Sequence, residues 1–461
     1  MARVFLLNPP SPEPVKTPLL SFCHLAASLR EGGHEVALLD ASAPHAPNEI
    51  GAIEAIIADF APDLVGLHLK TLHVQPAYAV AARLKHRWPL VAGGPHATVC
   101  PDEPLAHGFT YVIRGEGEEV LVELADAMDG RRDLRQMDGL STAAGHNPGR
   151  PFIRDLDALA LPMTALDLFD PAWYGSTTAL PPAGLLSSRG CPAACTFCSN
   201  NVTGRKFRYR SPASIVQEIL YLQRTFGASR TMSFSFFDDS FAVGHRRVRE
   251  LCAALRTIRP QVHWTCTAHP AHLDPPTLLE MQRAGCGGVD IGMESGDPGM
   301  LLRIGKGVTV ERVLDVLGWC RELGLHVVVN LMFGWPGEND AELQATLDFM
   351  DRAAGLASAW NARGVLVPYP GTEIYDRYHE RHGFTDWWIR EPPLAYEPFP
   401  NAWDPAEIIR CYETDPALER NFFRHPQSHL EKIRTGLKKK AEHTFAAILQ
   451  TQPRLAAPGA R

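Results

Sequence analysis

The stretch Arg189-Gly190-Cys191-Pro192-Ala193-Ala194-Cys195-Thr196-Phe197-Cys198 carries three cysteines in the spacing C-x3-C-x2-C. Three thiolates on one short loop can bind three irons of a [4Fe-4S] cluster and leave the fourth iron open to a small molecule. A purely structural site normally closes its coordination with a fourth residue, and no further cysteine or histidine follows nearby in the sequence. The spacing therefore predicts a cluster that takes part in chemistry; the alternative is three core cysteines that share a loop by coincidence.

The composition is that of a globular protein. The chain has 461 residues, of which 45% are hydrophobic and 21% charged, and its net charge of -7 with interspersed acids and bases argues against nucleic acid as a partner. No apolar run reaches the ~18 residues of a membrane span, and none forms a signal-peptide core. The other seven cysteines lack C-x2-C pairing and are interpreted as buried thiols, so we expect a cytoplasmic protein without a disulfide framework.

The first part of the chain alternates short apolar runs with helical stretches. Strands are predicted at 3–7, 35–39, 63–67 and 90–92, with helices of about ten residues between them. This order predicts an α/β fold that begins with a Rossmann-like, doubly wound parallel sheet over residues 1–130. Such sheets bind ligands at the carboxyl ends of their strands.

A second α/β unit is predicted after a connector over residues 131–183, which is rich in Pro, Gly, Arg and Asp. Six strand-helix repeats between 184 and 380, the last strand at 364–367, fit a (β/α)6 partial TIM barrel. Each of these strands ends in polar residues, which is where barrels of this kind place their chemistry. Residues 381–461 are predicted to form a small helical region with a disordered tail from Gln452, and the lysine run 438–440 is interpreted as a solvated helix face.

The cysteine motif resembles that of the radical S-adenosylmethionine (radical SAM) superfamily. In that family the methionyl group of S-adenosylmethionine (SAM) binds the open iron, and one electron from the cluster cleaves SAM to a 5′-deoxyadenosyl radical. The loops Gly93-Gly94-Pro95-His96 and Gly115-Glu116-Gly117-Glu118 resemble the cobalamin-binding domain that precedes the barrel in one branch of the family. The resemblance implies Cys191, Cys195 and Cys198 as the iron ligands.

Further cofactor-binding residues follow from the same resemblance. It places SAM beside residues at the ends of the barrel strands, namely Phe197, Asp238, Asp239, Glu294, Ser295, Pro368 and Tyr369. A carboxylate can pair with the SAM ammonium or accept a ribose hydroxyl. Two alternatives stay open: Phe197 as a core residue, and either aspartate as a helix amino-cap.

The loop after the third strand departs from the family. It carries His68, Lys70 and His73 where relatives that hold cobalamin tend to have small hydroxyl residues, and the chain lacks an Asp-x-His-x-x-Gly run. Large side chains here would occupy the space of a flat corrin, so we expect cobalamin to be possible but not favoured. We expect the loop instead to cover the active site; the alternative is that its side chains point to solvent.

These features favour a radical SAM enzyme that removes hydrogen from a polar, hydroxylated substrate. The chain looks like the radical SAM diol dehydratases of aminoglycoside (antibiotic) biosynthesis, with an aminosugar-type substrate and Lys70, His68, Asp239 and His269 as candidate catalytic groups. A flavodoxin, a ferredoxin or a partner reductase would supply the electron. The alternatives are a cobalamin-dependent C-methyltransferase of the same branch and a non-catalytic cobalamin or cluster sensor.

Overall fold

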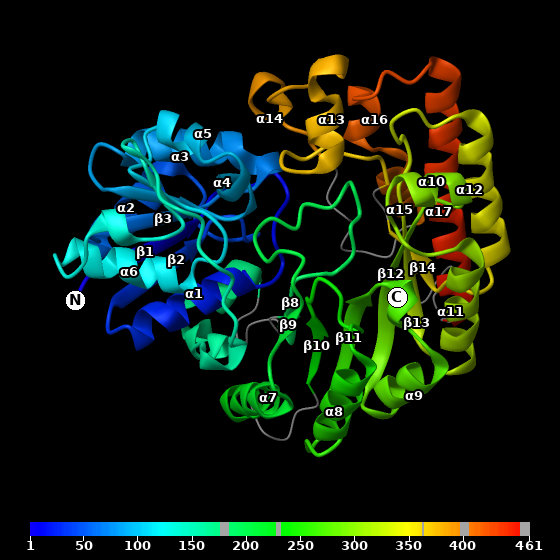
Figure 1. Cartoon of the computed structure of the whole chain (residues 1–461), viewed down its shortest axis with the longest axis horizontal. Helices are drawn as coiled ribbons and strands as arrows, with labels where there is room; N and C mark the ends of the chain where they lie inside the picture. Colours follow the sequence, from blue (N-terminus) through cyan, green and yellow to red (C-terminus); the bar gives the residue numbers. More distant parts are fainter. Residues whose placement is uncertain (176–183, 227–231, 362–363, 397–404, 452–461) are drawn as a thin grey trace.

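The computed structural model describes residues 1–175, 184–226, 232–361, 364–396 and 405–451. The tail predicted to be disordered from Gln452 lies outside these residues. Two α/β units lie side by side, and the carboxyl-terminal helices α13, α14 and α16 lie above them in Figure 1. The α/β prediction, with a Rossmann-like sheet, a partial barrel and carboxyl-terminal helices, is confirmed.

The first unit is a seven-stranded sheet in the order β2-β1-β3-β4-β5-β6-β7. Its five parallel strands are β1 (Arg3–Asn8), β2 (Glu35–Asp40), β3 (Leu64–His68), β4 (Leu90–Gly93) and β5 (Tyr111–Ile113). The hairpin β6 (Leu140–Thr142) and β7 (Gly145–His146) adds two antiparallel strands from the predicted connector. Val4 to Leu7 of β1 are all buried because this central strand is covered on both faces.

Helices follow the strands of the first unit in a doubly wound order. They are α1 (Leu20–Glu31), α2 (Ile50–Phe60), α3 (Val74–Leu84), α4 (Pro95–Val99), α5 (Asp102–Ala106) and α6 (Glu118–Met128), with a short 3-10 turn η1 (Thr71–His73) before α3. Helix α1 packs against α6, and α2 packs against α3. The strand order reverses between β1 and β3, the position at which sheets of this kind form a ligand-binding crevice.

The second unit is a five-stranded parallel sheet in the order β10-β11-β12-β13-β14. The strands are β10 (Ser233–Phe236), β11 (His263–Ala268), β12 (Cys286–Glu294), β13 (His326–Leu331) and β14 (Ala359–Trp360). Leu185 pairs in parallel with Phe236 and adds a sixth strand position, as a (β/α)6 barrel requires. The predicted strand at 364–367 contributes a single bridge, from Val365 to Phe333, and the last regular pairing comes earlier, at β14.

Helices on the outside of this sheet begin with clear amino-terminal signals. They are α7 (Pro212–Phe226), α8 (His245–Leu255), α9 (Pro275–Arg283), α10 (Pro298–Arg303), α11 (Val310–Glu322) and α12 (Asp340–Ala353). Asp274, Asp297 and Thr309 cap α9, α10 and α11 through their side chains, and Asn339 with Glu342 forms a capping box on α12. On β11 buried and exposed residues alternate, so one face packs against helices and the other stays open.

The carboxyl-terminal region comprises α13 (Glu373–His382), α14 (Trp387–Arg390), α15 (Pro405–Glu413), α16 (Pro416–Arg420) and the long helix α17 (Gln427–Thr451). Helix α17 packs against β14 and α12. Its lysine run is not a uniformly solvated face: Lys440 is fully buried over the ring of Phe333, and Lys439 pairs with Asp351. Among the described residues, no helix is long and apolar enough to cross a membrane.

Candidate functional site

The three cysteines lie on a loop closed at its base by a two-stranded ribbon. Strand β8 (Ser188–Arg189) pairs antiparallel with β9 (Arg208–Tyr209), and the loop between them spans residues 190–207. Gly190 has a φ of +85°, and a Cβ there would lie 2.4 Å from the Lys206 carbonyl, so the closure of this loop depends on glycine. Asp239 accepts hydrogen bonds from the Gly190 amide (2.7 Å) and the Thr203 hydroxyl (2.8 Å), which orders both ends of the loop.

The three thiols lie close enough to influence one another. Burial, together with the neighbouring Cys195 and Cys191, raises the pKa of Cys198 to about 11. Cys195 is buried, whereas Cys191 is partly exposed and Cys198 exposed. Thiolates crowded in this way repel one another unless cations bind between them, so the donor set fits a cluster with three thiolate ligands.

A buried ion pair lies beside the cysteine loop. The Glu294 carboxylate accepts a hydrogen bond from the Lys306 Nζ at 2.9 Å, and both side chains are at least nine-tenths buried. Glu294 has a φ of +69°, a strained conformation for a residue with a side chain. A Cβ on Gly292 would lie 2.1 Å from the Glu294 Oε1, so this glycine leaves the room that the pair occupies.

Lys306 is a site residue that the sequence analysis missed. It lies between two glycines with positive φ, Gly305 and Gly307, and this Gly-Lys-Gly pattern after α10 was the available signal. The turn holds the cysteine loop, since Thr196 donates its amide to Ile304 and a Cβ on Gly305 would lie 2.8 Å from the Ala194 carbonyl. Although burial opposes the ammonium, Glu294 and the nearby thiolates keep the pKa of Lys306 above its ordinary value.

Other predicted side chains are engaged with the protein itself. Asp238 is buried and accepts hydrogen bonds from the Ser187 amide and hydroxyl and from the Ser188 hydroxyl. The Ser295 hydroxyl lies 3.2 Å from that of Thr346. His269 donates from Nε2 to the Lys306 carbonyl (2.8 Å) and accepts the Ala271 amide at Nδ1, and burial, helped by Lys306, lowers its pKa to about 4.

Three further predicted cofactor contacts, Phe197, Pro368 and Tyr369, lie beside tryptophan side chains. Phe197 packs edge-on against the buried Trp335, with 5.2 Å between ring centroids. The Pro368 carbonyl accepts a hydrogen bond from Trp387 Nε1, and the ring of Tyr369 lies 6.4 Å from the Trp387 ring. These contacts place the segment around Pro368 against α14.

A cavity of about 370 Å3 separates the two α/β units at the carboxyl end of the first sheet. The backbone of four glycines at the ends of β4 and β5 borders it: Gly93, Gly94, Gly115 and Gly117. On the other side lie Val202 and Thr203 of the cysteine loop and Phe237, which follows β10. His24 and His68 also border it, and each has one buried ring nitrogen without a hydrogen-bond partner. Open glycine backbone and unpartnered donors or acceptors are the features of a site that accepts a large ligand.

Of the three side chains expected to block a corrin, His68 borders this cavity, whereas Lys70 and His73 do not. Lys70 lies in a separate polar crevice at the ends of β1 and β2, with Asn8, Ser42 and His73. His68 packs its ring edge against Phe22 and against the backbone of Gly94, and burial, with the Lys70 charge, lowers its pKa to about 3. The steric argument against cobalamin is therefore wrong for Lys70.

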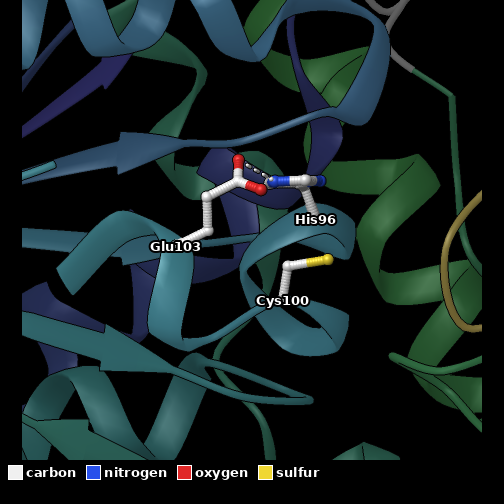
Figure 2. Close-up of side chains that lie close together, drawn as sticks. All are labelled: His96, Cys100 and Glu103. Atoms are coloured by element: carbon white, nitrogen blue, oxygen red, sulfur yellow. Dashed lines mark hydrogen bonds and ion pairs between the residues drawn. The ribbon is translucent and has the colours of Figure 1, made fainter. Parts of the chain in front are cut away.

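His96 of α4 does not border the cavity and lies beside Glu103 and Cys100 (Figure 2). Its Nε2 lies 2.9 Å from Glu103 and its Nδ1 3.1 Å from the Thr71 hydroxyl, while Glu103 also accepts from Tyr78 and Trp388. Burial, with the charge of Glu103, raises the pKa of Cys100 to about 12, so it stays a thiol. These hydrogen bonds connect α4, which directly follows Gly93-Gly94, to α5 and α14.

Comparison with known proteins finds two family models in this order along the chain. A B12 binding domain matches residues 15–125, and the radical SAM superfamily matches residues 185–350. An uncharacterized methyltransferase of Pyrococcus horikoshii is 29% identical over 390 residues, covering 81% of this chain and 82% of its own. Bacteriochlorophyllide d C-12(1)-methyltransferase of Chlorobaculum tepidum is 27% identical over 330 residues, covering 70% and 68%.

A solved structure shares the fold of both units. The radical SAM methyltransferase TsrM of Kitasatospora setae, with cobalamin and a [4Fe-4S] cluster bound, superposes with a TM-score of 0.66 at 21% identity, covering 88% of this chain and 80% of its own.

The expectation of a diol dehydratase is wrong: the two relatives above, which match 81% and 70% of the chain, are both named as methyltransferases. The expected family is confirmed by both models. The chain therefore combines an amino-terminal B12-binding domain with a radical SAM domain, and the radical SAM domain implies a [4Fe-4S] cluster and SAM as cofactors.

Proposed function

We propose that this protein is a cobalamin-dependent radical SAM methyltransferase that acts on a small molecule. The cavity between the two units carries this proposal, because it is bordered on one side by the glycine loops of the B12-binding domain and on the other by the cysteine loop. The names of the relatives support the same reaction class. The dehydratase roles proposed for Lys70, His68, Asp239 and His269 are withdrawn with that function.

The chain's own residues suit the two cofactors. Cys191, Cys195 and Cys198 would hold the cluster, and the Glu294–Lys306 pair beside them would bind polar groups of SAM. When bound, the cluster would supply the electron that cleaves SAM, and cobalamin would carry the methyl group to the substrate. The loops at Gly93-Gly94 and Gly115-Gly117 would let backbone approach the cobalamin.

Asp239 orders the cysteine loop, and His269 holds the turn at Lys306. Because these contacts order the cysteine loop and the turn that carries Lys306, we propose that both residues position cofactor groups. Phe197, Asp238, Ser295, Pro368 and Tyr369 stay predicted cofactor contacts. A flavodoxin- or ferredoxin-type donor and a polar substrate also stay predictions.

The first prediction concerns the iron ligands. Replacing Cys191, Cys195 or Cys198 singly by Ala should abolish the [4Fe-4S] absorption or 5′-deoxyadenosine formation, because two thiolates cannot hold a cluster with one open iron. Iron content and 5′-deoxyadenosine yield with dithionite and SAM provide the measurement. Cys286→Ala and Cys320→Ala, which change buried cysteines of the barrel wall, should keep iron near the wild-type level. Wild-type yield from any of the three loop variants would rule out the assignment.

The second prediction concerns Glu294. Glu294→Gln removes the charged partner of Lys306 and should weaken SAM binding by about 1.5–3 kcal/mol, the range for a hydrogen bond to a charged group. The cluster should still assemble, since none of its ligands changes. Calorimetry with SAM measures the dissociation constant. Glu280→Gln, which changes a carboxylate paired with Arg256 on an outer helix, is the matched control. Equal dissociation constants in the two variants would give Glu294 a structural role only.

The third prediction tests the function. Protein from cells supplied with hydroxocobalamin should retain the corrin spectrum after desalting, and with methyl-labelled SAM it should convert its substrate, found by screening, to a product that carries the label. Gly94→Ala should weaken cobalamin binding by about tenfold or more, because the new Cβ would meet the ring of His68 at 2.4 Å at the cavity wall.

Gly130→Ala is the matched control for the third prediction. Gly130 also has a positive φ, but a Cβ there meets nothing within 4 Å. Cobalamin uptake should match the wild type. A product that has lost water without gaining a labelled methyl group, or a wild-type protein without cobalamin, would contradict the proposed function.

A further inference from the structure

A network of buried charges joins the loop after β5 to the base of the cysteine loop. Glu116 and Glu118 come from the B12-binding domain, and Arg189 and Arg208 come from β8 and β9. All four side chains are at most 7% exposed. The network therefore lies in the contact between the two α/β units, where water does not screen it.

Each arginine is held by more than one acceptor. Arg189 donates to Glu116 at 2.8 Å and also to Glu118, so its guanidinium bridges both carboxylates. Arg208 donates to both oxygens of Glu116, at 2.9 and 2.7 Å, and to the Ile153 carbonyl at 2.7 Å. A planar guanidinium with several fixed acceptors has one orientation, which a lysine cannot reproduce.

The two arginines occupy a special position in the fold. Arg189 and Arg208 are directly paired residues of the β8–β9 ribbon, and the loop that this ribbon closes contains all three cysteines. Arg208 also donates to the Thr203 carbonyl at 2.7 Å, inside the loop. The carboxylates thus bind the base of the cysteine loop at both of its strands.

The backbone and carboxylate at Glu116 are held by further hydrogen bonds. Glu116 accepts a hydrogen bond from the Ile153 amide at 2.8 Å, and Gly115, with a φ of +83°, donates its amide to the Thr98 hydroxyl oxygen at 3.1 Å. Glu116, Glu118 and Arg189 all border the cavity between the units. One rigid set of contacts therefore borders the cavity and closes the cysteine loop.

We propose that Arg189 and Arg208, held by Glu116 and Glu118, are positioning residues that fix the cysteine loop relative to the cobalamin cavity. This inference rests on the proposed function for the identity of the second cofactor. The network would set the separation between the two cofactor sites. It would thereby control transfer of a methyl cation from SAM to reduced cobalamin, cob(I)alamin, which leaves S-adenosylhomocysteine, whereas SAM cleavage would depend on the cysteine loop and the barrel. Its loss uncouples the two activities.

Arg189→Lys tests the proposal, because it keeps the charge and removes the bridge between the two carboxylates. In protein without cofactors, hydrogen exchange of amides in 188–209 should accelerate about tenfold, while the barrel helices stay protected. In loaded protein, transfer of labelled methyl from SAM to cobalamin that has been reduced to cob(I)alamin with titanium(III) citrate should fall at least about tenfold, the scale for a small misplacement of reacting groups. Iron content and 5′-deoxyadenosine formation with dithionite should stay near the wild-type level.

Arg30→Lys is the matched control. Arg30 forms a bidentate pair with Asp167 at 2.7 and 2.9 Å, remote from the cysteine loop, and this variant should change none of the four measurements. Arg208→Lys should behave like Arg189→Lys.

Unchanged exchange and unchanged methyl transfer in Arg189→Lys would overturn the proposal. Parallel loss of iron, 5′-deoxyadenosine and methyl transfer would also overturn it, since the arginines would then serve folding alone. A wild-type protein that takes up no cobalamin would refute the proposed function, and the hydrogen-exchange result would still decide whether the network holds the loop.

Discussion

The contact on which the structure depends is the buried ion network between Glu116 and Glu118 of one unit and Arg189 and Arg208 of the other. Removing one partner from a buried ion pair typically costs about 3–5 kcal/mol, because it leaves an uncompensated charge. Two carboxylates and two guanidiniums compensate one another here, and the neighbouring His24 stays neutral because burial, with the Arg189 charge, lowers its pKa to about 3. The network thus favours one arrangement of the two units.

A second set of hydrogen bonds connects the first α/β unit to the carboxyl-terminal region. Trp388 of α14 donates to Glu103, and Gln75 of α3 donates to the Trp388 carbonyl at 2.8 Å. The adjacent Trp387 donates to the Pro368 carbonyl. The carboxyl-terminal region therefore links the hydrogen bonds around His96 to the segment at Pro368, which is predicted to contact SAM. The Gly93-Gly94 loop at the cavity is thus connected both to its own unit and to α14.

Local sequence patterns predicted most of the fold. The alternation of strands and helices and the polar residues at strand ends were sufficient for both α/β units, because they reflect short-range periodicity. The hairpin β6–β7 was missed because its two strands are only three and two residues long. The last barrel strand was misplaced because β14 is equally short.

The site was predicted less completely, because side-chain direction depends on tertiary contacts. The C-x3-C-x2-C spacing indicates a cluster by itself, whereas the partners of Arg189 lie more than 70 residues away in sequence. The position of Lys70 follows from the strand order, which places it near Asn8 and Ser42 and not at the cavity. The expectation that Lys70 would occupy the corrin site did not take the strand order into account. It was wrong, and the wrong reaction class followed from it.

The most direct test of this account is anomalous diffraction at the cobalt and iron absorption edges from anaerobic crystals of protein loaded with hydroxocobalamin and iron-sulfur cluster. The account predicts an iron peak at Cys191, Cys195 and Cys198 and a cobalt peak in the cavity bordered by Gly94, Gly117 and Phe237. Absence of cobalt, or a cobalt peak outside that cavity, would contradict it.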